Sequence, residues 1–408
     1  MNICFLVWSP DISGGTNVIF EHATRLFSLG NNVTMVTADK ISNKRLAWFP
    51  GAEKLSWKTY DEVSTSDFDL AIATWWRTVF FLERVKSKNY AYFVQSIESR
   101  FYPEDEKVLR NLVEQTYTLQ LNFITEATWI KDYLYQNYGI NAFLVKNGIR
   151  KEYFNKEIRP ISERTPGKTR LLIEGPLNVP FKNTELALKI AKKSDADEIW
   201  LLTSSPIGAI SGVDKLFSRV PISKVGEIYA SCDILIKLST VEGMFGPPLE
   251  AFHCGCTSVS YDVTGYDEYI EHNVNALVSF SRNDEEVLSY INQLCNHNEI
   301  LDKLKLGALS TANNWPDWDE SSNIFKKVCE TIIISNKKNN YVCAFSSAKL
   351  MIETYSIYEK TNQANDLSML IKLRFKVLNY VNNNFPSLFF MLRKFKYYLT
   401  SKSKSFRT

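Results

Sequence analysis

Two glutamates flank a glycine- and proline-rich turn in the second half of the chain. Glu242 and Glu250 are separated by the seven residues GMFGPPL. The Pro-Pro pair ends the loop and permits a helix to start near Leu249, because proline is tolerated in a first helical turn, where its missing N–H costs nothing. The loop amides and the helix N-terminus are then expected to form an anion site. Such a site could hold a diphosphate, with Glu250 accepting hydrogen bonds from a ribose and Glu242 reaching a sugar hydroxyl.

Either glutamate alone has a simpler interpretation as a helix-capping or surface acid, because acidic residues favour first helical turns. The pair is more specific, since it surrounds the turn and follows the apolar run DILIKLS (233–239) directly. The combination therefore favours a ligand site over two independent surface acids.

The elements that position this site follow from alternating sequence patterns. An apolar strand over 3–8, a Gly-Gly turn, an amphipathic helix over 18–29 and a β-branched strand over 32–37 predict a βαβ unit, which builds a parallel sheet. The pattern continues to Gly148 and begins again with TRLLIEG after a polar, proline-containing segment over 158–168. We therefore expect an α/β fold with two Rossmann-like domains facing across a cleft, because ligands of parallel sheets bind beyond the carboxyl ends of the strands.

The expected domain bounds are 1–157 for the first Rossmann-like domain, 158–335 for the second and 336–408 for a basic, amphipathic helical extension.

Composition is that of an ordinary globular protein. Apolar residues make up 45% and charged residues 23% of the 408 residues, and the net charge of +3 is not typical of a nucleic-acid-binding protein. The seven cysteines are scattered without the spacing of a disulfide framework, which predicts a reducing, cytoplasmic location. The pair Cys254 and Cys256 has no second pair nearby, so burial in a turn is favoured over a metal site. We expect no signal peptide and no membrane-spanning segment.

The segment STVEGMFGPPLEAFHCGCTSV (239–259) resembles the donor-binding signature of glycosyltransferase family 4, whose members are retaining enzymes of the GT-B fold. Further matches are Gly14-Gly15, the run NGI at 147–149 and the G-x-x-E run at 265–268. The run QSIESRFYPEDE (95–106) is similar to a segment of rhamnosyltransferase-like members of the family. The resemblance implies transfer of a sugar from a nucleotide-sugar donor to a glycan or lipid-linked glycan acceptor, as in bacterial cell-surface polysaccharide synthesis.

The resemblance also implies that the first domain (1–157) binds the acceptor and the second (158–335) binds the donor, and it implies roles for particular residues. Glu242 would bind the donor sugar, Lys182 would neutralise the leaving diphosphate, and Gln95 would lie near the reacting carbon. The donor-binding residues would be Gly15, Gly175, Phe245, Gly246, Leu249 and Glu250, with the amides of Phe245 and Gly246 facing the ligand.

Two positions depart from the family pattern. Pro176 follows Gly175 where the family places an arginine, so Lys182 works alone or is assisted by Arg219 or another cation. Gln95 stands where the family often has a histidine, and a glutamine cannot act as a general base. These departures keep open an alternative function, a catalytically weakened glycan-binding or scaffold protein of the same fold.

Aromatic residues after the strands of the first domain are candidates for acceptor binding, because sugar rings stack on aromatic faces. For Trp75 and Trp76, burial in the core is an equally weighted alternative. The candidates are Trp75, Trp76, Phe101 and Tyr102.

The sequence predicts no metal and no cofactor. No Asp-x-Asp motif lies at a strand end, and the four histidines have no evident serine or cysteine partner. A nicotinamide oxidoreductase is disfavoured, because no G-x-G-x-x-G follows a strand. Charge on the leaving group would then be met by Lys182, loop amides and helix dipoles.

Residues 367–408 contain nine lysines or arginines and no acids, interleaved with apolar residues. This pattern is typical of helices on anionic membrane surfaces, and it is favoured here over a helix pair that packs back on the domains. We therefore expect peripheral attachment to the inner face of the plasma membrane.

Overall fold

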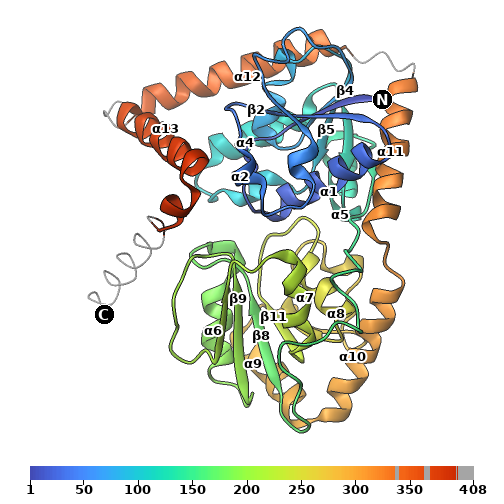
Figure 1. Ribbon diagram of the computed structural model, residues 1–408, viewed down its shortest axis with the longest axis vertical. Coiled ribbons are helices and arrows are strands. Elements are labelled where there is room, and N and C mark those ends of the chain that lie inside the picture. The colour runs from blue at the N-terminus through green and yellow to red at the C-terminus, as the bar shows by residue number, and fades with distance from the viewer. Residues whose placement is uncertain (336–339, 363–367, 392, 394–408) are drawn as a thin grey trace. The chain divides into compact units, whose positions relative to one another are not determined.

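The computed structural model describes residues 1–335, 340–362, 368–391 and 393. The described chain forms two compact units (Figure 1). Unit 1 contains Met1–Gly148 and Trp318–Met391, and unit 2 contains Ile149–Asp317. The first boundary thus lies nine residues before the expected boundary after residue 157, and residues 318–335 belong to unit 1 rather than to the donor-binding domain.

Unit 1 is built on a seven-stranded parallel sheet with the strand order β3-β2-β1-β4-β5-β6-β7. The chain moves outward from β1 in both directions, which creates a topological switch point between β1 and β4. The strands are β1 (Asn2–Leu6), β2 (Asn32–Thr37), β3 (Ser56–Thr59), β4 (Phe68–Ala73), β5 (Ser87–Val94), β6 (Asn122–Thr125) and β7 (Phe143–Leu144).

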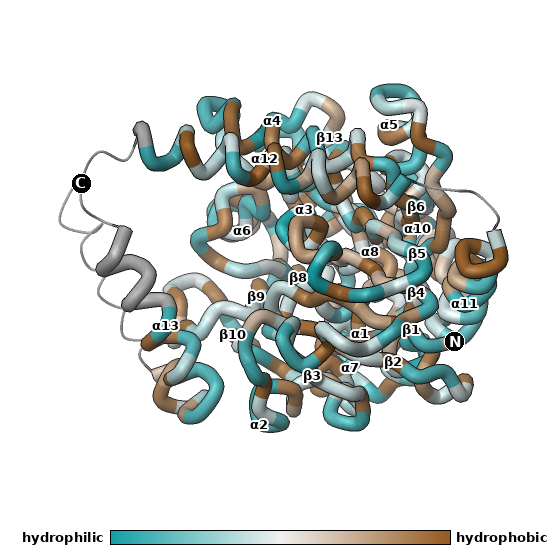
Figure 2. Tube along the Cα trace, turned by 90° about the horizontal axis from the view of Figure 1, so that it is seen from above, coloured by the Kyte–Doolittle hydropathy of each residue, from teal (hydrophilic) through white to brown (hydrophobic). Residues whose placement is uncertain are grey.

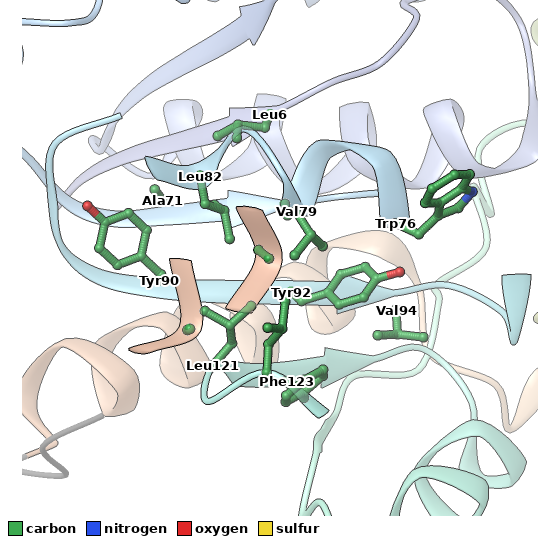
Figure 3. Close-up of a cluster of buried hydrophobic side chains, with 14 of the residues drawn as sticks. Leu6, Ala71, Trp76, Val79, Leu82, Tyr90, Tyr92, Val94, Leu121 and Phe123 are labelled. Carbon is green, nitrogen blue, oxygen red and sulfur yellow. The ribbon is translucent and has the colours of Figure 1, made fainter. Parts of the chain in front are cut away.

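Helices cover both faces of this sheet. They are α1 (Gly14–Ser28), α2 (Asn43–Leu46), α3 (Trp76–Val79), α4 (Lys107–Gln115), α5 (Thr128–Tyr138), α11 (Trp318–Ile334), α12 (Tyr341–Asn362) and α13 (Ser368–Asn384). Along β1 the buried side chains alternate, because successive residues of a strand point to opposite faces. Cys4 and Leu6 join the core on one face, which Figure 3 shows around Tyr92, and Ile3 and Phe5 join the core on the other.

Unit 2 repeats the architecture with six parallel strands in the order β10-β9-β8-β11-β12-β13. The strands are β8 (Arg170–Glu174), β9 (Glu198–Thr203), β10 (Lys215–Ser218), β11 (Ile234–Lys237), β12 (Thr257–Tyr261) and β13 (Leu277–Ser279). The helices are α6 (Thr184–Ala191), α7 (Ile222–Ala230), α8 (Gly246–His253), α9 (Asp284–Asn296) and α10 (Asn298–Asn313). Here the switch point lies between β8 and β11.

The chain returns to unit 1 after unit 2. In α11, Phe325 stacks on His22 of α1 with ring centroids 4.2 Å apart, and the Ser322 hydroxyl lies 3.1 Å from Nδ1 of His22. Both contacts are buried, so α11 completes the core of unit 1.

The C-terminal extension is helical as predicted, and its described part packs on unit 1. Ala344 and Ala348 of α12 belong to the core around Tyr92, and hydrophobic and hydrophilic residues alternate along this helix (Figure 2). In α13, the Asn383 amide donates to the Lys40 carbonyl at 3.1 Å. The described helices include none that is both long and apolar enough to cross a bilayer. The prediction of two Rossmann-like α/β domains with a helical extension is therefore confirmed.

Candidate functional site

The candidate site of unit 2 lies at the carboxyl ends of β8 and β11, where loops leave a parallel sheet in opposite directions. The loop after β8 carries Gly175 and Lys182, and the loop after β11 carries Glu242. Two hydrogen bonds tie these loops together: the Thr240 amide donates to the Phe181 carbonyl at 2.8 Å, and the Asn183 side chain donates to the Leu238 carbonyl at 3.0 Å.

Lys182 and Glu242 form an ion pair at this edge. The lysine ammonium lies 2.7 Å from each carboxylate oxygen of Glu242, and both side chains are largely buried. Burial by itself raises the pKa of Glu242, but the positive charges of Lys182 and Lys237 outweigh it and hold that pKa below its ordinary value. Glu242 is therefore ionised at neutral pH, and the structure brings together the two residues to which the sequence assigned catalytic roles in this domain.

Gly175 follows β8 in a backbone conformation that other residues rarely adopt, with φ of 150°. A Cβ atom at this position would lie 2.5 Å from the Thr184 hydroxyl, which itself donates to the Pro176 carbonyl at 3.0 Å. Glycine at 175 is thus required by close packing at the strand end.

The start of α8 differs from the predicted anion site. The Gly246 amide donates to the Met244 carbonyl at 2.9 Å, and Pro247 and Pro248 have no N–H. The Tyr269 hydroxyl donates to the Phe245 carbonyl just before the same helix end. A local turn thus uses the Gly246 amide in this structure, and the contact of this amide with a ligand stays a prediction.

The side chains of Phe245 and Leu249 are fully buried in the core of unit 2 and so support the loop from below. Glu250 is half-buried in α8, with Oε2 at 3.4 Å from the Tyr229 hydroxyl. The carboxylate of Glu250 can accept further hydrogen bonds from the hydroxyl groups of a ligand, because a carboxylate accepts about four.

In unit 1 the structure brings Gly15 and Gln95 together. A Cβ atom on Gly15 would lie 3.2 Å from Oε1 of Gln95, so glycine leaves room for this amide at the start of α1. The amide nitrogen of Gln95 donates to the Thr74 carbonyl at 3.2 Å, whereas Oε1 is buried with no hydrogen-bond partner among the described residues. An unsatisfied buried acceptor is costly unless a ligand or water completes it.

The aromatic candidates separate into two groups. Trp76 is 1% exposed, and its indole donates to the Tyr102 hydroxyl at 3.0 Å. Trp76 is therefore a core residue (Figure 3). Trp75 is half-buried and meets the exposed Trp8 edge to face at 5.2 Å, and Phe101 is also exposed. Phe101 is therefore the most exposed of the four candidates, whereas Trp75 and Tyr102 are half-buried and Arg77 lies over the Trp75 ring at 5.6 Å.

Sequence reasoning missed a second ion pair at the same sheet edge. Lys237, the last residue of β11, is 2% exposed and binds both the side chain and the backbone carbonyl of Glu174, the last residue of β8. A lysine inside the otherwise apolar run DILIKLS was the available signal, because lysine is almost never buried without a partner.

Among the described residues no group of three or more His, Cys, Asp or Glu side chains is arranged to hold a metal ion. The thiols of Cys254 and Cys256 are unpaired, and Cys256 donates to the Tyr229 and Cys232 carbonyls in the core.

One family model matches the segment that contains part of this site. Residues 215–308, which include Glu242, α8 and Glu250, match the family model described as Glycosyl transferases group 1.

Among curated proteins, the chain is similar to the chitobiosyldiphosphodolichol beta-mannosyltransferase of Candida albicans. The two are 26% identical over 168 residues, which is 39% of this chain and 32% of the relative. The chain thus matches about a third of the relative's length.

Solved structures with a similar fold include HepE of Anabaena in complex with UDP and glucose, with a TM-score of 0.63 and 14% identity over 81% of this chain and all of that chain. TarM of S. aureus, in complex with Fondaparinux, alpha-GlcNAc-glycerol and UDP, has a TM-score of 0.62 and 10% identity over 82% of this chain and all of that chain. The chain therefore has the two-domain architecture of GT-B glycosyltransferases, and its second unit carries a glycosyltransferase group 1 segment.

Proposed function

We propose that this protein is a retaining, metal-independent hexosyltransferase that resembles family 4 enzymes and moves a sugar from a nucleotide-sugar donor to a glycan or lipid-linked glycan. The observation that carries the proposal is the buried Lys182–Glu242 pair at the strand ends of unit 2, with Glu242 inside the segment that matches the group 1 model. The structural neighbours HepE and TarM were solved with UDP, which supports a nucleotide donor.

The site has the chemistry that a nucleoside diphosphate sugar needs. Glu250 accepts hydrogen bonds from the ribose, and Glu242 accepts one from a hydroxyl of the sugar. When the donor enters, Lys182 exchanges part of its contact with Glu242 for the diphosphate, since phosphate oxygens and carboxylates compete for the same ammonium protons. Positive charge held in a largely buried site stabilises the leaving diphosphate without a metal.

We assign acceptor binding to unit 1. The rings of the exposed Phe101 and Trp8, with the half-buried Trp75 beside Trp8, suit the apolar faces of sugar rings. Gln95 orients the reacting hydroxyl by a hydrogen bond and cannot remove its proton. The proton therefore passes to an oxygen of the leaving phosphate, which lies on the same face as the attack and so retains the anomeric configuration.

Retention needs a direct measurement, because the name of the curated relative specifies a β-mannosyl product. NMR of the first product formed will give the anomeric configuration before mutarotation or further reaction. A product with the configuration of the donor supports the proposal, and an inverted product contradicts it.

The donor itself is found by a transfer and thermal-shift screen against uridine, thymidine and guanosine diphosphate sugars, with a rhamnose donor included. The screen also separates the enzyme from a glycan-binding or scaffold protein, because an enzyme slowly hydrolyses its donor when no acceptor is present. Glycan binding without any turnover of any donor would favour the scaffold function.

We further propose that the basic C-terminal segment attaches the enzyme to the cytoplasmic face of a membrane that holds a lipid-linked acceptor of surface polysaccharide synthesis. Most of the basic residues after Met391 lie outside the described residues. The relative from Candida albicans, whose name specifies a diphosphodolichol acceptor, supports a lipid-linked substrate.

Vesicle flotation tests this attachment. Deleting 367–408 would also remove the α13 contacts to unit 1, such as Asn383 to Lys40, so it is a poor control. Substitution of Lys394, Lys396, Lys402 and Lys404 by glutamine keeps those contacts and removes four charges. We expect this variant to lose binding to anionic vesicles, and equal binding by both proteins would contradict membrane attachment.

A further inference from the structure

A buried ammonium lies next to the candidate diphosphate site. Lys237 ends β11, and its Nζ would be 3.6 Å from a Cβ atom on Gly175, at the point where the chain leaves β8. The side chain is 2% exposed, whereas that of its partner Glu174 is 21% exposed. The carboxylate is thus the solvent-facing member of the pair.

Two hydrogen bonds hold this ammonium, and both go to Glu174. The ammonium donates one to the carboxylate and the other to the backbone carbonyl, at 3.2 Å. An ammonium has three donors, so one remains without a partner among the described residues. A buried ammonium with incomplete hydrogen bonding is expensive unless something else compensates it.

The charge of Lys237 also acts beyond its direct partner. Burial lowers the pKa of Lys237, but the carboxylates of Glu174, Glu242 and Glu250 raise it more, so the group stays charged. Glu242 is the carboxylate that Lys182 binds, so both lysines act on one acid.

We infer that Lys237 is a second cation for the diphosphate of the nucleotide-sugar donor, and that the entering diphosphate replaces the Glu174 carboxylate as its partner. The inference deepens the function proposed above and rests on it. The resemblance left open which cation assists Lys182, because Pro176 stands where an arginine was expected. Lys237 reaches the same turn from the neighbouring strand and is, by this inference, that second cation.

The charges of the cluster make the role of Glu174 specific. Two ammonium groups face the three carboxylates of Glu174, Glu242 and Glu250, which leaves one net negative charge when no ligand is bound. Because a diphosphate is an anion, it competes with Glu174 for Lys237. Removing the charge of Glu174 should therefore strengthen diphosphate binding, while removing the charge of Lys237 should weaken it.

The test is calorimetric binding of a nucleoside and of its diphosphate to the full-length protein, with uridine and UDP and then guanosine and GDP as probes. The ratio of the two affinities isolates the contribution of the diphosphate. We expect Lys237→Met to reduce this ratio at least tenfold and leave nucleoside binding unchanged, and Glu174→Gln to increase it.

Two further variants protect the test against loss of folding. The double variant Lys237→Met/Glu174→Gln leaves no unpaired buried charge, and it should fold and still show the reduced ratio. Lys305→Met breaks the ion pair with Asp233, in which the amine lies 2.9 Å from Oδ1, just before the opposite end of β11. Its ratio should equal that of the wild type.

The outcomes separate the inference from the function on which it rests. If the wild type binds UDP or GDP and the double variant keeps the full ratio, Lys237 is a structural partner of Glu174 and the inference is wrong. If Glu174→Gln weakens diphosphate binding, the exchange of anions is also wrong. If the wild type binds no nucleoside diphosphate, the proposed function fails and the inference fails with it.

Discussion

At the scale of single residues, the Lys182–Glu242 pair is the contact on which the proposed chemistry depends. Glu242→Gln keeps the shape of the side chain and removes its charge, and Lys182→Ala removes the cation. We expect each to lower kcat/KM by about a hundredfold or more, the size of effect seen when one preorganised electrostatic contact to a transition state is lost. Steady-state kinetics with the donor found by the screen measures this.

Lys189→Ala is the matched control, because Lys189 is exposed on α6, a few residues after Lys182. Its turnover should equal that of the wild type. Wild-type turnover in both site variants would remove Lys182 and Glu242 from the mechanism.

A buried acid in unit 1 makes stability depend on pH. Glu98 accepts hydrogen bonds from the Trp76 amide and the Tyr92 hydroxyl, both at 2.8 Å, yet burial raises its pKa to about 8. The folded state therefore holds a proton on Glu98 that the unfolded state releases near its ordinary pKa of 4.5. The stabilisation is fully present below pH 4.5 and is lost as the pH rises to about 8.

Glu98→Gln should remove this pH dependence, because the amide is neutral throughout. The difference in the free energy of unfolding, variant minus wild type, should increase by roughly 2–4 kcal/mol between pH 5 and pH 8. Urea denaturation at several pH values measures the difference. The exposed Glu83→Gln provides a control that should show no such trend, and parallel curves for Glu98→Gln and wild type would contradict the prediction.

At the scale of elements, the start of α8 depends on a tyrosine from the loop after β12. The Tyr269 hydroxyl donates to the Phe245 carbonyl, and the residue is buried. Tyr269→Phe would remove this hydrogen bond. We expect the free energy of unfolding to fall by about 1–3 kcal/mol, together with weaker donor binding, because α8 carries Glu250.

Tyr266→Phe is the control for this prediction. The Tyr266 side chain lies in the same segment, and no hydrogen bond of its hydroxyl is found among the described residues. Chemical denaturation should give a value close to wild type for this variant. Equal stability of both phenylalanine variants would mean that the hydroxyl of Tyr269 does not stabilise the start of α8.

At the scale of the whole molecule, the two units should respond differently to a nucleotide. The contacts proposed above for the diphosphate and the ribose are in unit 2, around 174–183 and 237–250, whereas Gly15 is the one predicted donor-binding residue in unit 1. A saturating nucleoside diphosphate should therefore slow amide hydrogen exchange most strongly in these two segments, because ligand binding suppresses local opening. Mass spectrometry of peptides covers both units in one experiment, and protection confined to unit 1 would contradict the assignment.

The periodicity of the chain was sufficient to predict two doubly wound α/β domains. Alternating and continuous apolar runs are local consequences of burying a strand between helices, so β1 and β11 could be identified without any tertiary contact. The same is true of the turn between Glu242 and Glu250, because proline and glycine restrict the backbone at their own positions.

The contacts that complete the site could not be derived in this way. Lys237 pairs with a residue 63 positions away, and α11 follows unit 2 but packs on unit 1. The hydrogen bond from the Gly246 amide to the Met244 carbonyl also depends on the geometry of the turn, which the Gly-Pro pattern does not determine. Patterns along the chain report whether a side chain is buried, whereas the partner of a buried charge depends on which distant strand end lies beside it, and only the tertiary structure decides that.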